Sequence, residues 1–383
     1  MSVIPFVCSR QCSTDHFAQL SWIASPLQGT MLRINRQITI MLYDLLRPIL
    51  FSLEPERAHA ATFSLLRTAH HMGVLSLMRA TQVDDPVTLM GLKFRNRVGI
   101  AAGLDKNATC IDALGALGVG FVEVGTVTPQ PQPGNPTPRI FRIPQAQALI
   151  NRMGFPNDGV AAMCVRLQQR RYKGICGVNI GKNASTALEH AVDDYVACLK
   201  AVAPYADYVA VNVSSPNTVG LRSLQAVDHL KPILSELLNA REQLIPSLNR
   251  HLPLLVKIAP DLNLDELQQI ANLLLELGID GVIATNTTLQ RPESWSLGKL
   301  AEEKGGLSGA PVHTLSLATV RALRDMLGSG FPIIGVGGIT SAAQAQAMRD
   351  AGTDLVQIYT GLIYRGPALI GETLRTFAIH MRP

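Results

Sequence analysis

The chain has 383 residues, of which 47% are hydrophobic and 31 are glycine, and its formal net charge is +5. This balance is typical of a globular α/β protein and excludes an intrinsically disordered chain. Lysine and arginine are scattered, with no dense basic run interleaved with aromatic residues, so nucleic acid is not an expected partner.

Residues 1–40 are an extension of uncertain role. Asp15 is their only acidic residue, which resembles a weak organelle presequence or an upstream extension before a start at Met31 or Met41. The sequence does not separate these alternatives. No run of about 18 apolar residues occurs, so a membrane-spanning helix is not expected. The six cysteines show no paired metal spacing, so no metal site is expected.

Residues 41–80 are expected to form a subdomain of two amphipathic helices. Apolar residues recur at helical spacing in the segment 38–53, and Pro48 should kink that helix. The second helix opens at Pro55, which suits a first helical turn, and its apolar face includes Phe63. Periodicity alone favours a cap packed on the core over a helical pair that rests in a membrane interface.

Eight short apolar runs follow, separated by segments of helical length. Continuous apolar strands that alternate with helices predict a parallel sheet, and eight such units match a closed (β/α)8 TIM barrel, expected over residues 81–383. An open doubly wound sheet is the competing fold, but it would require a dinucleotide fingerprint where the chain reads GIAAGLDKN. The runs are 98–103, 121–126, 177–181, 208–213, 254–259, 281–287, 332–338 and 355–361.

The longest interruption lies between the second and third runs. Its many prolines exclude a helix. The segment is therefore expected to cross the mouth of the barrel, where long structured loops are commonly functional.

Nearly every predicted strand ends in amides, hydroxyls or lysine, at the end of a barrel where active sites lie. Polar residues at the end of a single strand are explained by turns and helix caps, but polar residues at the ends of all eight strands favour a ligand-binding or active site. Lys257 is the sharpest case, because a charge inside an apolar strand is costly unless an anion pairs with it. Lys106 has an ordinary alternative as an exposed lysine paired with Asp105.

The last two predicted strands indicate one ligand. The motifs GVGGI and YTG offer backbone N–H groups where a barrel usually holds phosphate, which fits a sugar phosphate as well as a cofactor. Asn179 and Asn212 carry both donors and acceptors, as the edge of a flavin does, and Lys257 is suited to stabilise negative charge on a reduced flavin.

Ten motifs, in this order along the chain, closely resemble the dihydroorotate dehydrogenases over about residues 41 to 375. The resemblance is to the quinone-dependent, membrane-associated class, for two reasons. Ser215 stands where the soluble class is expected to carry cysteine, and a helical pair precedes the barrel. The motifs are AAGLDKN, GTVTPQPQPGNPTPRIFR, NRMGF, NIGKN, VNVSSPNT, VKIAPDL, ATNTT, GGLSG, IIGVGGI and QIYTG.

That resemblance implies oxidation of dihydroorotate to orotate in pyrimidine biosynthesis, with FMN as the bound acceptor and a membrane quinone as co-substrate. Ser215 would remove the C5 proton while a hydride leaves C6 for the flavin. Because a serine hydroxyl is a poor base, its proton is expected to move on through water, with Thr218 as a member of the relay.

The family pattern also assigns the binding residues. It implies a peripheral protein on the cytoplasmic face of a bacterial inner membrane, expected to be a monomer or weak dimer. For His59, the residue alone favours a partly buried helix side chain, and only the resemblance assigns it to quinone. FMN would contact Ala102, Gly103, Lys106, Thr126, Asn179, Asn212, Lys257, Thr285, Gly309, Gly338, Tyr359 and Thr360; the substrate would contact Lys106, Asn151, Arg152, Met153, Gly154, Phe155, Asn212, Asn217, Asn286 and Thr287; quinone would contact His59, Arg142 and Tyr359.

Three rival functions stay open at this point. A related FMN barrel that uses fumarate or NAD would need no amphipathic helical pair. A phosphate-binding aldolase or isomerase would use Lys257 as a Schiff-base lysine. A non-catalytic flavin-binding or membrane scaffold would leave Ser215 and the NRMGF motif without purpose.

Overall fold

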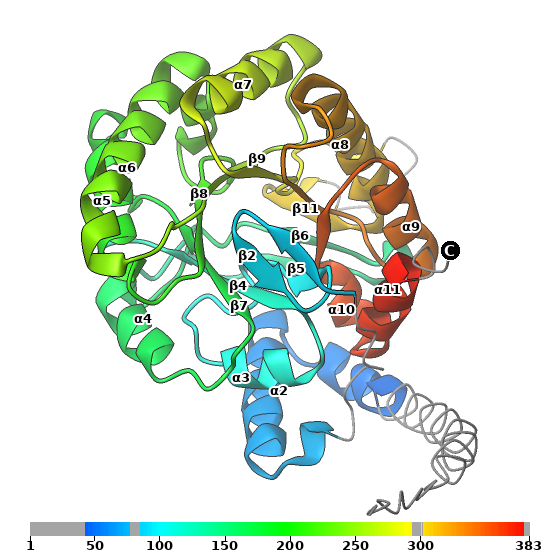
Figure 1. The fold of residues 1–383 in the computed structure, drawn as a ribbon. Helices are drawn as coiled ribbons and strands as arrows, with labels where there is room; N and C mark the ends of the chain where they lie inside the picture. Colours follow the sequence, from blue (N-terminus) through cyan, green and yellow to red (C-terminus); the bar gives the residue numbers. More distant parts are fainter. Residues whose placement is uncertain (1–42, 77–84, 293–299, 301, 379–383) are drawn as a thin grey trace, which may run out of the picture.

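The computed structural model describes residues 43–76, 85–292, 300 and 302–378. Eight parallel strands close into a barrel in sequence order, as Figure 1 shows in a view down the barrel. Each predicted apolar run overlaps one of these strands, so the predicted (β/α)8 barrel is confirmed. The strands are β3 (Val98–Ile100), β4 (Phe121–Val127), β7 (Ile175–Ile180), β8 (Tyr208–Asn212), β9 (Leu254–Ile258), β10 (Gly281–Ala284), β12 (Ile333–Val336) and β13 (Leu355–Ile358).

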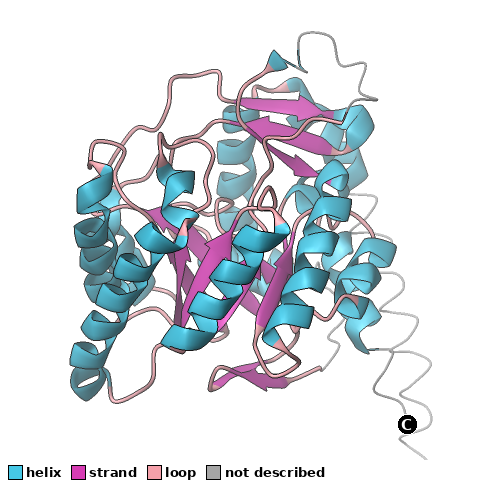
Figure 2. Ribbon diagram, turned by 90° about the horizontal axis from the view of Figure 1, so that it is seen from above, coloured by secondary structure: helices cyan, strands magenta, loops and turns pink. Residues whose placement is uncertain are grey.

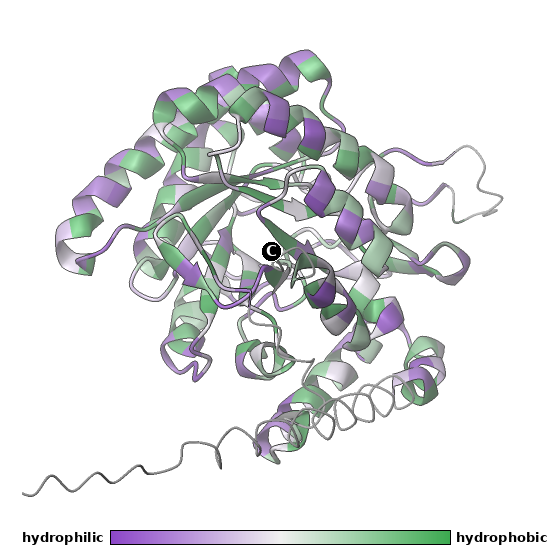
Figure 3. Cartoon of the chain, turned by 45° about the vertical axis from the view of Figure 1, so that its right-hand side comes forward, coloured by the Kyte–Doolittle hydropathy of each residue, from purple (hydrophilic) through white to green (hydrophobic). Residues whose placement is uncertain are grey.

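Helices surround the barrel and bury their apolar faces against it. Figure 3 shows the strands mainly hydrophobic and the helices hydrophilic on their outer faces. Every barrel strand is followed by at least one α-helix before the next barrel strand begins, and the last strand is followed by α10 and α11. The helices are α3 (Ile111–Ala116), α4 (Gly159–Gln168), α5 (Ala191–Val202), α6 (Val227–Leu248), α7 (Leu264–Leu277), α8 (His313–Leu327), α9 (Ala342–Asp350), α10 (Thr360–Arg365) and α11 (Ala368–Ala378).

Helix α7 shows how local sequence sets these elements. Asn263 caps its start by accepting from the backbone N–H of Glu266, and the Glu266 carboxylate accepts from the Asn263 N–H in return. The helix ends at Gly278, whose φ of 64° is accessible to glycine at little cost. Between these caps, Leu267, Ile270 and other apolar residues are buried against the barrel.

Two helices precede the barrel, as predicted. The first has 43–52 as its described part and continues through Pro48; the second is α2 (Pro55–His71), with Pro55 in its first turn and Phe63 buried. Within the described ranges, no helix combines the length and apolar character needed to cross a bilayer. The extension 1–40 lies outside the described residues, as do residues 41–42 and 77–80 of the expected helical subdomain.

An ion pair ties α2 to the barrel. Nε and Nη2 of Arg139 donate to the Glu56 carboxylate at 2.6 and 3.0 Å, and Nη1 donates to the carbonyl oxygens of Pro133 and Asn135 at 2.6 and 2.8 Å. The Arg139 side chain is 11% exposed, so solvent weakens the pair less than at the surface.

We expect Arg139→Met to lower the free energy of unfolding by about 1–3 kcal/mol, since it leaves a mostly buried carboxylate without its charged donor. Lys231→Met is the control, because the Lys231–Glu276 pair is 48% and 56% exposed and contributes about 0–1 kcal/mol. Urea unfolding measures both, and equal losses would contradict the expectation.

A hairpin that the sequence did not predict closes the amino-terminal end of the barrel. It consists of β1 (Val87–Leu89) and β2 (Leu92–Phe94), joined by Met90 and Gly91, whose φ angles are 54° and 74°. Phe94 is fully buried and its ring lies 5.4 Å from that of Phe121, edge to face. The hairpin lies below the barrel in Figure 2 and leaves only the opposite end open for a site.

The proline-rich segment leads to the other end of the barrel. Within 126–155, all of which the structure describes, there is no α-helix, as the prolines predicted. Instead, β5 (Ile140–Ile143) and β6 (Ala148–Asn151) join β11 (Gly306–Gly309) in an antiparallel sheet, visible above the barrel in Figure 2.

Candidate active site

A cavity opens at the carboxyl ends of the barrel strands, beneath the antiparallel sheet. Most of the residues assigned to FMN and substrate line it. The strand ends therefore converge as the sequence predicted. The lining residues from those two sets, together with Ser215, are Ala102, Gly103, Lys106, Thr126, Asn151, Met153, Gly154, Phe155, Asn212, Ser215, Asn217, Lys257, Thr285, Asn286, Thr287, Gly309, Gly338, Tyr359 and Thr360.

Two assigned residues are not among the described residues that line this cavity. The Arg152 guanidinium lies 4.6 Å from the Phe141 ring centroid and donates to the Glu303 carboxylate at 2.5 Å. Asn179 is fully buried in the layer behind the wall. Arg152 therefore supports the wall from outside, and Asn179 acts through its neighbours.

Amides and hydroxyls below the cavity hold one another in fixed orientations. Nδ2 of Asn212 donates to Thr126 Oγ1 at 2.9 Å and to Asn179 Oδ1 at 3.1 Å, while Asn179 Nδ2 donates to Glu123 Oε1 at 2.9 Å. Asn286 Nδ2 donates to Asn212 Oδ1 at 3.2 Å. Because each amide is oriented on its inner side, the pattern of donors and acceptors facing the cavity is set before a ligand binds.

Glu123 is the counter-charge that Lys257 requires. Its carboxylate is fully buried and lies 3.8 Å from the Lys257 ammonium. It also accepts hydrogen bonds from Tyr208 Oη at 2.8 Å and Gln357 Nε2 at 2.7 Å. Burial lowers the pKa of Lys257, and the carboxylate opposes this shift. Sequence reasoning missed Glu123, although a charge inside the apolar run FVEVGT is the same signal that singled out Lys257.

Ser215 lies in the loop after β8. Its side chain is nearly buried, and its Oγ accepts from the Asn217 N–H at 3.2 Å. Asn217 Nδ2 donates to Asn151 Oδ1 at 3.1 Å, which joins this loop to β6. The Thr218 hydroxyl is buried and has no hydrogen-bond partner among the described residues. Its donor and its acceptor are therefore both unused by the described residues.

Glycines shape the far side of the cavity. Gly337 and Gly338 follow β12 with φ angles of 123° and 74°, and a Cβ on Gly338 would lie 2.5 Å from backbone atoms of His313. A Cβ on Gly309, whose φ is 100°, would lie 2.2 Å from the Gln147 carbonyl oxygen. No other residue fits here without a shift of the backbone, and the exposed backbone N–H groups suit an anion such as phosphate.

Lys106 reaches the cavity from the loop after β3. Its Nζ donates to the Gly103 carbonyl at 2.7 Å, and burial lowers the pKa of the ammonium to about 8 although Glu56 and Asp105 oppose the shift. The ordinary alternative does not hold, because Asp105 is buried and accepts from the backbone N–H groups of Thr109 and Cys110.

A second, largely apolar cavity lies under the helical pair. His59, Arg142 and Tyr359 line it, and Tyr359 and Lys106 line both cavities, so the two adjoin. Burial, and then the charge of Lys106, lowers the pKa of His59 to about 4. Arg142 donates to the carbonyl oxygens of Phe51 and Leu53 at 3.1 and 2.8 Å, which holds the junction of the two helices.

The described residues contain no group of three or more His, Cys, Asp or Glu side chains that could hold a metal ion. The fold and the two cavities define a (β/α)8-barrel enzyme with a polar site next to an apolar chamber. Residues 86–380 match the family model for dihydroorotate dehydrogenase. The chain belongs to that family.

Proteins named "Dihydroorotate dehydrogenase (quinone)" are similar over most of their length. The protein from Bordetella parapertussis is 54% identical over 339 residues, which cover 88% of this chain and 97% of that protein. The protein from Acinetobacter baylyi is 53% identical over 332 residues, 87% of this chain and 98% of its own. A crystal structure of dihydroorotate dehydrogenase from Eimeria tenella in complex with ferulenol has a TM-score of 0.77 and 37% identity, and covers 88% of this chain and 99% of its own.

Proposed function

We propose that this enzyme oxidises (S)-dihydroorotate to orotate in de novo pyrimidine biosynthesis and passes the electrons to a quinone. The names of its bacterial relatives support this reaction. The observation that carries it is one cavity in which Ser215 lies beside Asn217, Asn151 and Asn286, with Lys257 in the wall. This set offers a base, amides for a planar ring with carbonyl and N–H groups, and a cation.

The residues fit FMN as the cofactor. Among the described residues, the buried Thr287 Oγ1 and Gln357 Oε1 lack hydrogen-bond partners, and both side chains line the cavity, so they suit a polar ligand. Thr126, Asn212 and Lys257 would hold the flavin ring, with Asn179 behind them, while Gly309, Gly338 and Thr360 would hold the phosphate. When bound, FMN accepts the hydride that leaves C6 of dihydroorotate.

Ser215 would take the C5 proton of the substrate. A serine hydroxyl is hardly ionised at neutral pH, so it must pass its own proton on as it accepts the new one. The unpartnered hydroxyl of Thr218, three residues further on, is suited to receive it through water. Asn217 and Asn286 would hold the ring, and the Lys106 ammonium would pair with the substrate carboxylate.

Quinone would enter through the apolar cavity under the helical pair and meet Tyr359 at the boundary with the polar site. Six large apolar side chains within residues 43–76 are exposed, from Leu45 at 67% to Val74 at 39%, and three of them, Leu65, Met72 and Val74, line this cavity. An exposed apolar face of this kind suits a membrane interface. We therefore propose that the protein is peripheral to a membrane, with residues 41–80 as the membrane-associating part and the barrel of 81–383 as the catalytic part. The similarity to bacterial proteins supports the cytoplasmic face of an inner membrane as its location.

Orotate affinity should depend on pH through Lys106. Below pH 8 its ammonium is charged and attracts the orotate carboxylate; above pH 8 the ligand-free protein loses this charge, and binding must restore it. We expect the Kd for orotate, followed by the change in flavin absorbance, to be flat near pH 7 and to rise up to about tenfold per unit above pH 8. In Lys106→Gln the Kd should be higher and flat across this range; a wild-type Kd that does not rise would contradict the role of Lys106.

The colour of the purified protein tests the cofactor. We expect a yellow protein that releases about one FMN per chain on denaturation. A colourless protein that borohydride links to a carbonyl compound at Lys257 would instead support the Schiff-base alternative, since lysine forms such adducts.

A further inference from the structure

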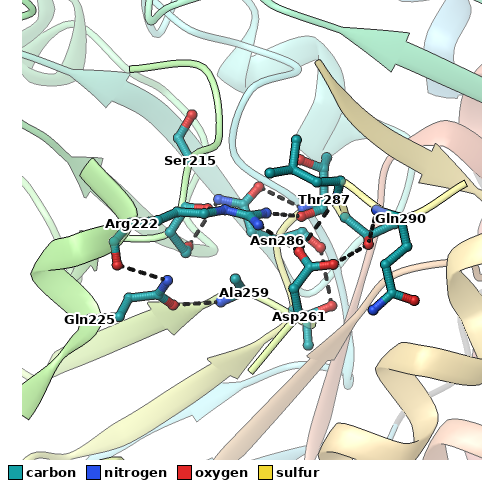
Figure 4. Close-up of polar contacts among 12 residues, drawn as sticks. Ser215, Arg222, Gln225, Ala259, Asp261, Asn286, Thr287 and Gln290 are labelled. Atoms are coloured by element: carbon teal, nitrogen blue, oxygen red, sulfur yellow. Dashed lines mark hydrogen bonds and ion pairs between the residues drawn. The ribbon is translucent and has the colours of Figure 1, made fainter. Parts of the chain in front are cut away.

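Arg222 connects three loops of the active site without lining it. It lies in the short helix η4 (Leu221–Gln225), which begins directly after the loop of Ser215. Neither Arg222 nor its partner Asp261 is among the described residues that line either cavity. Figure 4 shows the Arg222 guanidinium on the side of the loops away from the Ser215 hydroxyl, between Ser215 and Thr287.

Each nitrogen of the Arg222 guanidinium is bound to a different loop. Nε donates to the carbonyl oxygen of Ser214, next to the proposed base, at 3.2 Å. Nη2 donates to the Thr287 carbonyl after β10 at 2.7 Å, and Nη1 donates to Asp261 Oδ2 after β9 at 2.7 Å. A guanidinium is planar and rigid, so these bonds fix the three partners relative to one another.

The partners of Arg222 are themselves held in place. The second carboxylate oxygen of Asp261 accepts from the Thr288 hydroxyl, and Gln225 Oε1 accepts from the Ala259 N–H at 2.8 Å. The side chains of Arg222 and Asp261 are only 20% and 18% exposed, so solvent screens this pair little. The cluster therefore ties the base of the Ser215 loop to the ends of both β9 and β10.

We infer that Arg222 is a positioning residue that sets the place of Ser215 relative to Asn286 and Thr287. This inference rests on the proposed function, in which Ser215 takes a proton from a ring that Asn286 and Thr287 hold. A shift of about 1 Å between a base and its substrate lowers the rate of reaction by about 100-fold. The effect must fall on substrate oxidation, because quinone approaches from the cavity under the helical pair.

The test compares Arg222→Met with Arg241→Met in the FMN-loaded enzyme. Arg241 pairs with Asp280 at 2.8 Å with side chains 9% and 15% exposed, and Asp280 precedes β10, at the opposite end of the barrel. This control therefore removes a comparable ion pair far from the site. Stopped-flow absorbance under anaerobic conditions gives the rate of flavin reduction by saturating dihydroorotate and the rate of reoxidation by a soluble quinone.

We expect Arg222→Met to slow flavin reduction by about 10- to 100-fold and to leave reoxidation within about twofold of wild type. Arg222→Lys should recover part of the loss, because lysine keeps the charge but not the fork of donors. If Arg222→Met fails to fold, Arg222→Lys replaces it in the same two measurements. The inference is wrong if Arg222→Met leaves flavin reduction unchanged. It is also wrong if Arg222→Met slows both half-reactions in parallel, which is the pattern that a general loss of stability would cause and that Arg241→Met controls for.

Amide hydrogen exchange provides a readout that needs no substrate. Residues 214–221 should exchange faster in Arg222→Met than in wild type and Arg241→Met, since their loop has lost its anchor. A wild-type flavin that dihydroorotate does not bleach would overturn the proposed function, whereas unchanged exchange in this loop would overturn the role of Arg222 whatever the substrate.

Discussion

Ser215→Ala is expected to slow reduction of the flavin by dihydroorotate by about 10²–10⁴-fold, the range for loss of a general base. The hydroxyl that lies in the cavity, bonded to the Asn217 N–H, is the only part of the side chain removed. FMN content and reoxidation by quinone should stay close to wild type. Anaerobic stopped-flow measurements of the two half-reactions check both statements.

Two variants sharpen this prediction. Ser215→Cys restores an ionisable group at the same position and should recover part of the rate, more so as pH rises toward the ordinary pKa of a thiol. Thr218→Val removes the unpartnered hydroxyl and should slow reduction less than Ser215→Ala, because water can replace one member of a relay. A Ser215→Ala enzyme that reduces its flavin at a near-normal rate would remove Ser215 from the role of base.

Glu123→Gln is expected to destabilise the flavin-free protein by about 3–5 kcal/mol, the cost of leaving a buried charge without its partner. The Lys257 ammonium, 3.8 Å away, loses its counter-charge. The carboxylate also accepts from Asn179 at one oxygen and from Tyr208 and Gln357 at the other, and the glutamine amide keeps only one of these two acceptors. The midpoint of urea unfolding measures the loss.

The double variant Glu123→Gln with Lys257→Met shows whether the two charges depend on each other. Because methionine removes the uncompensated ammonium, the double variant should be more stable than the sum of the single losses by about 1–3 kcal/mol. Glu189→Gln is the control, since Glu189 is exposed and its loss of charge should change little. Single losses that simply add would show that Glu123 and Lys257 are not a pair.

The sequence predicted the features that are local along the chain. Each barrel strand is an apolar run that ends in polar residues, and Pro55 opens α2 as predicted. Because all parallel strands point the same way, residues such as Asn212 and Lys257 had to meet at one end once the barrel closed. The expected cavity follows from that topology alone.

The remaining features depend on contacts between distant segments. β6 pairs with β11, so Asn151 lies opposite Gly306, far along the chain. The β1–β2 hairpin is short, and what identifies it is the packing of Phe94 against Phe121. The sequence gives no sign of the role of Arg222, because its three partners follow three different strands and come together only in the folded barrel. Arg152 was assigned to substrate from its motif, yet its side chain pairs with Glu303 outside the cavity.

The most direct measurement of the central claim is an anaerobic absorbance titration of the purified protein. We predict that dihydroorotate bleaches the flavin band and that a soluble ubiquinone analogue then restores it, which demonstrates both half-reactions in one cuvette. Recovery with fumarate or NAD but not with the quinone would contradict the proposed acceptor. A flavin band that dihydroorotate never bleaches would contradict the proposed function itself.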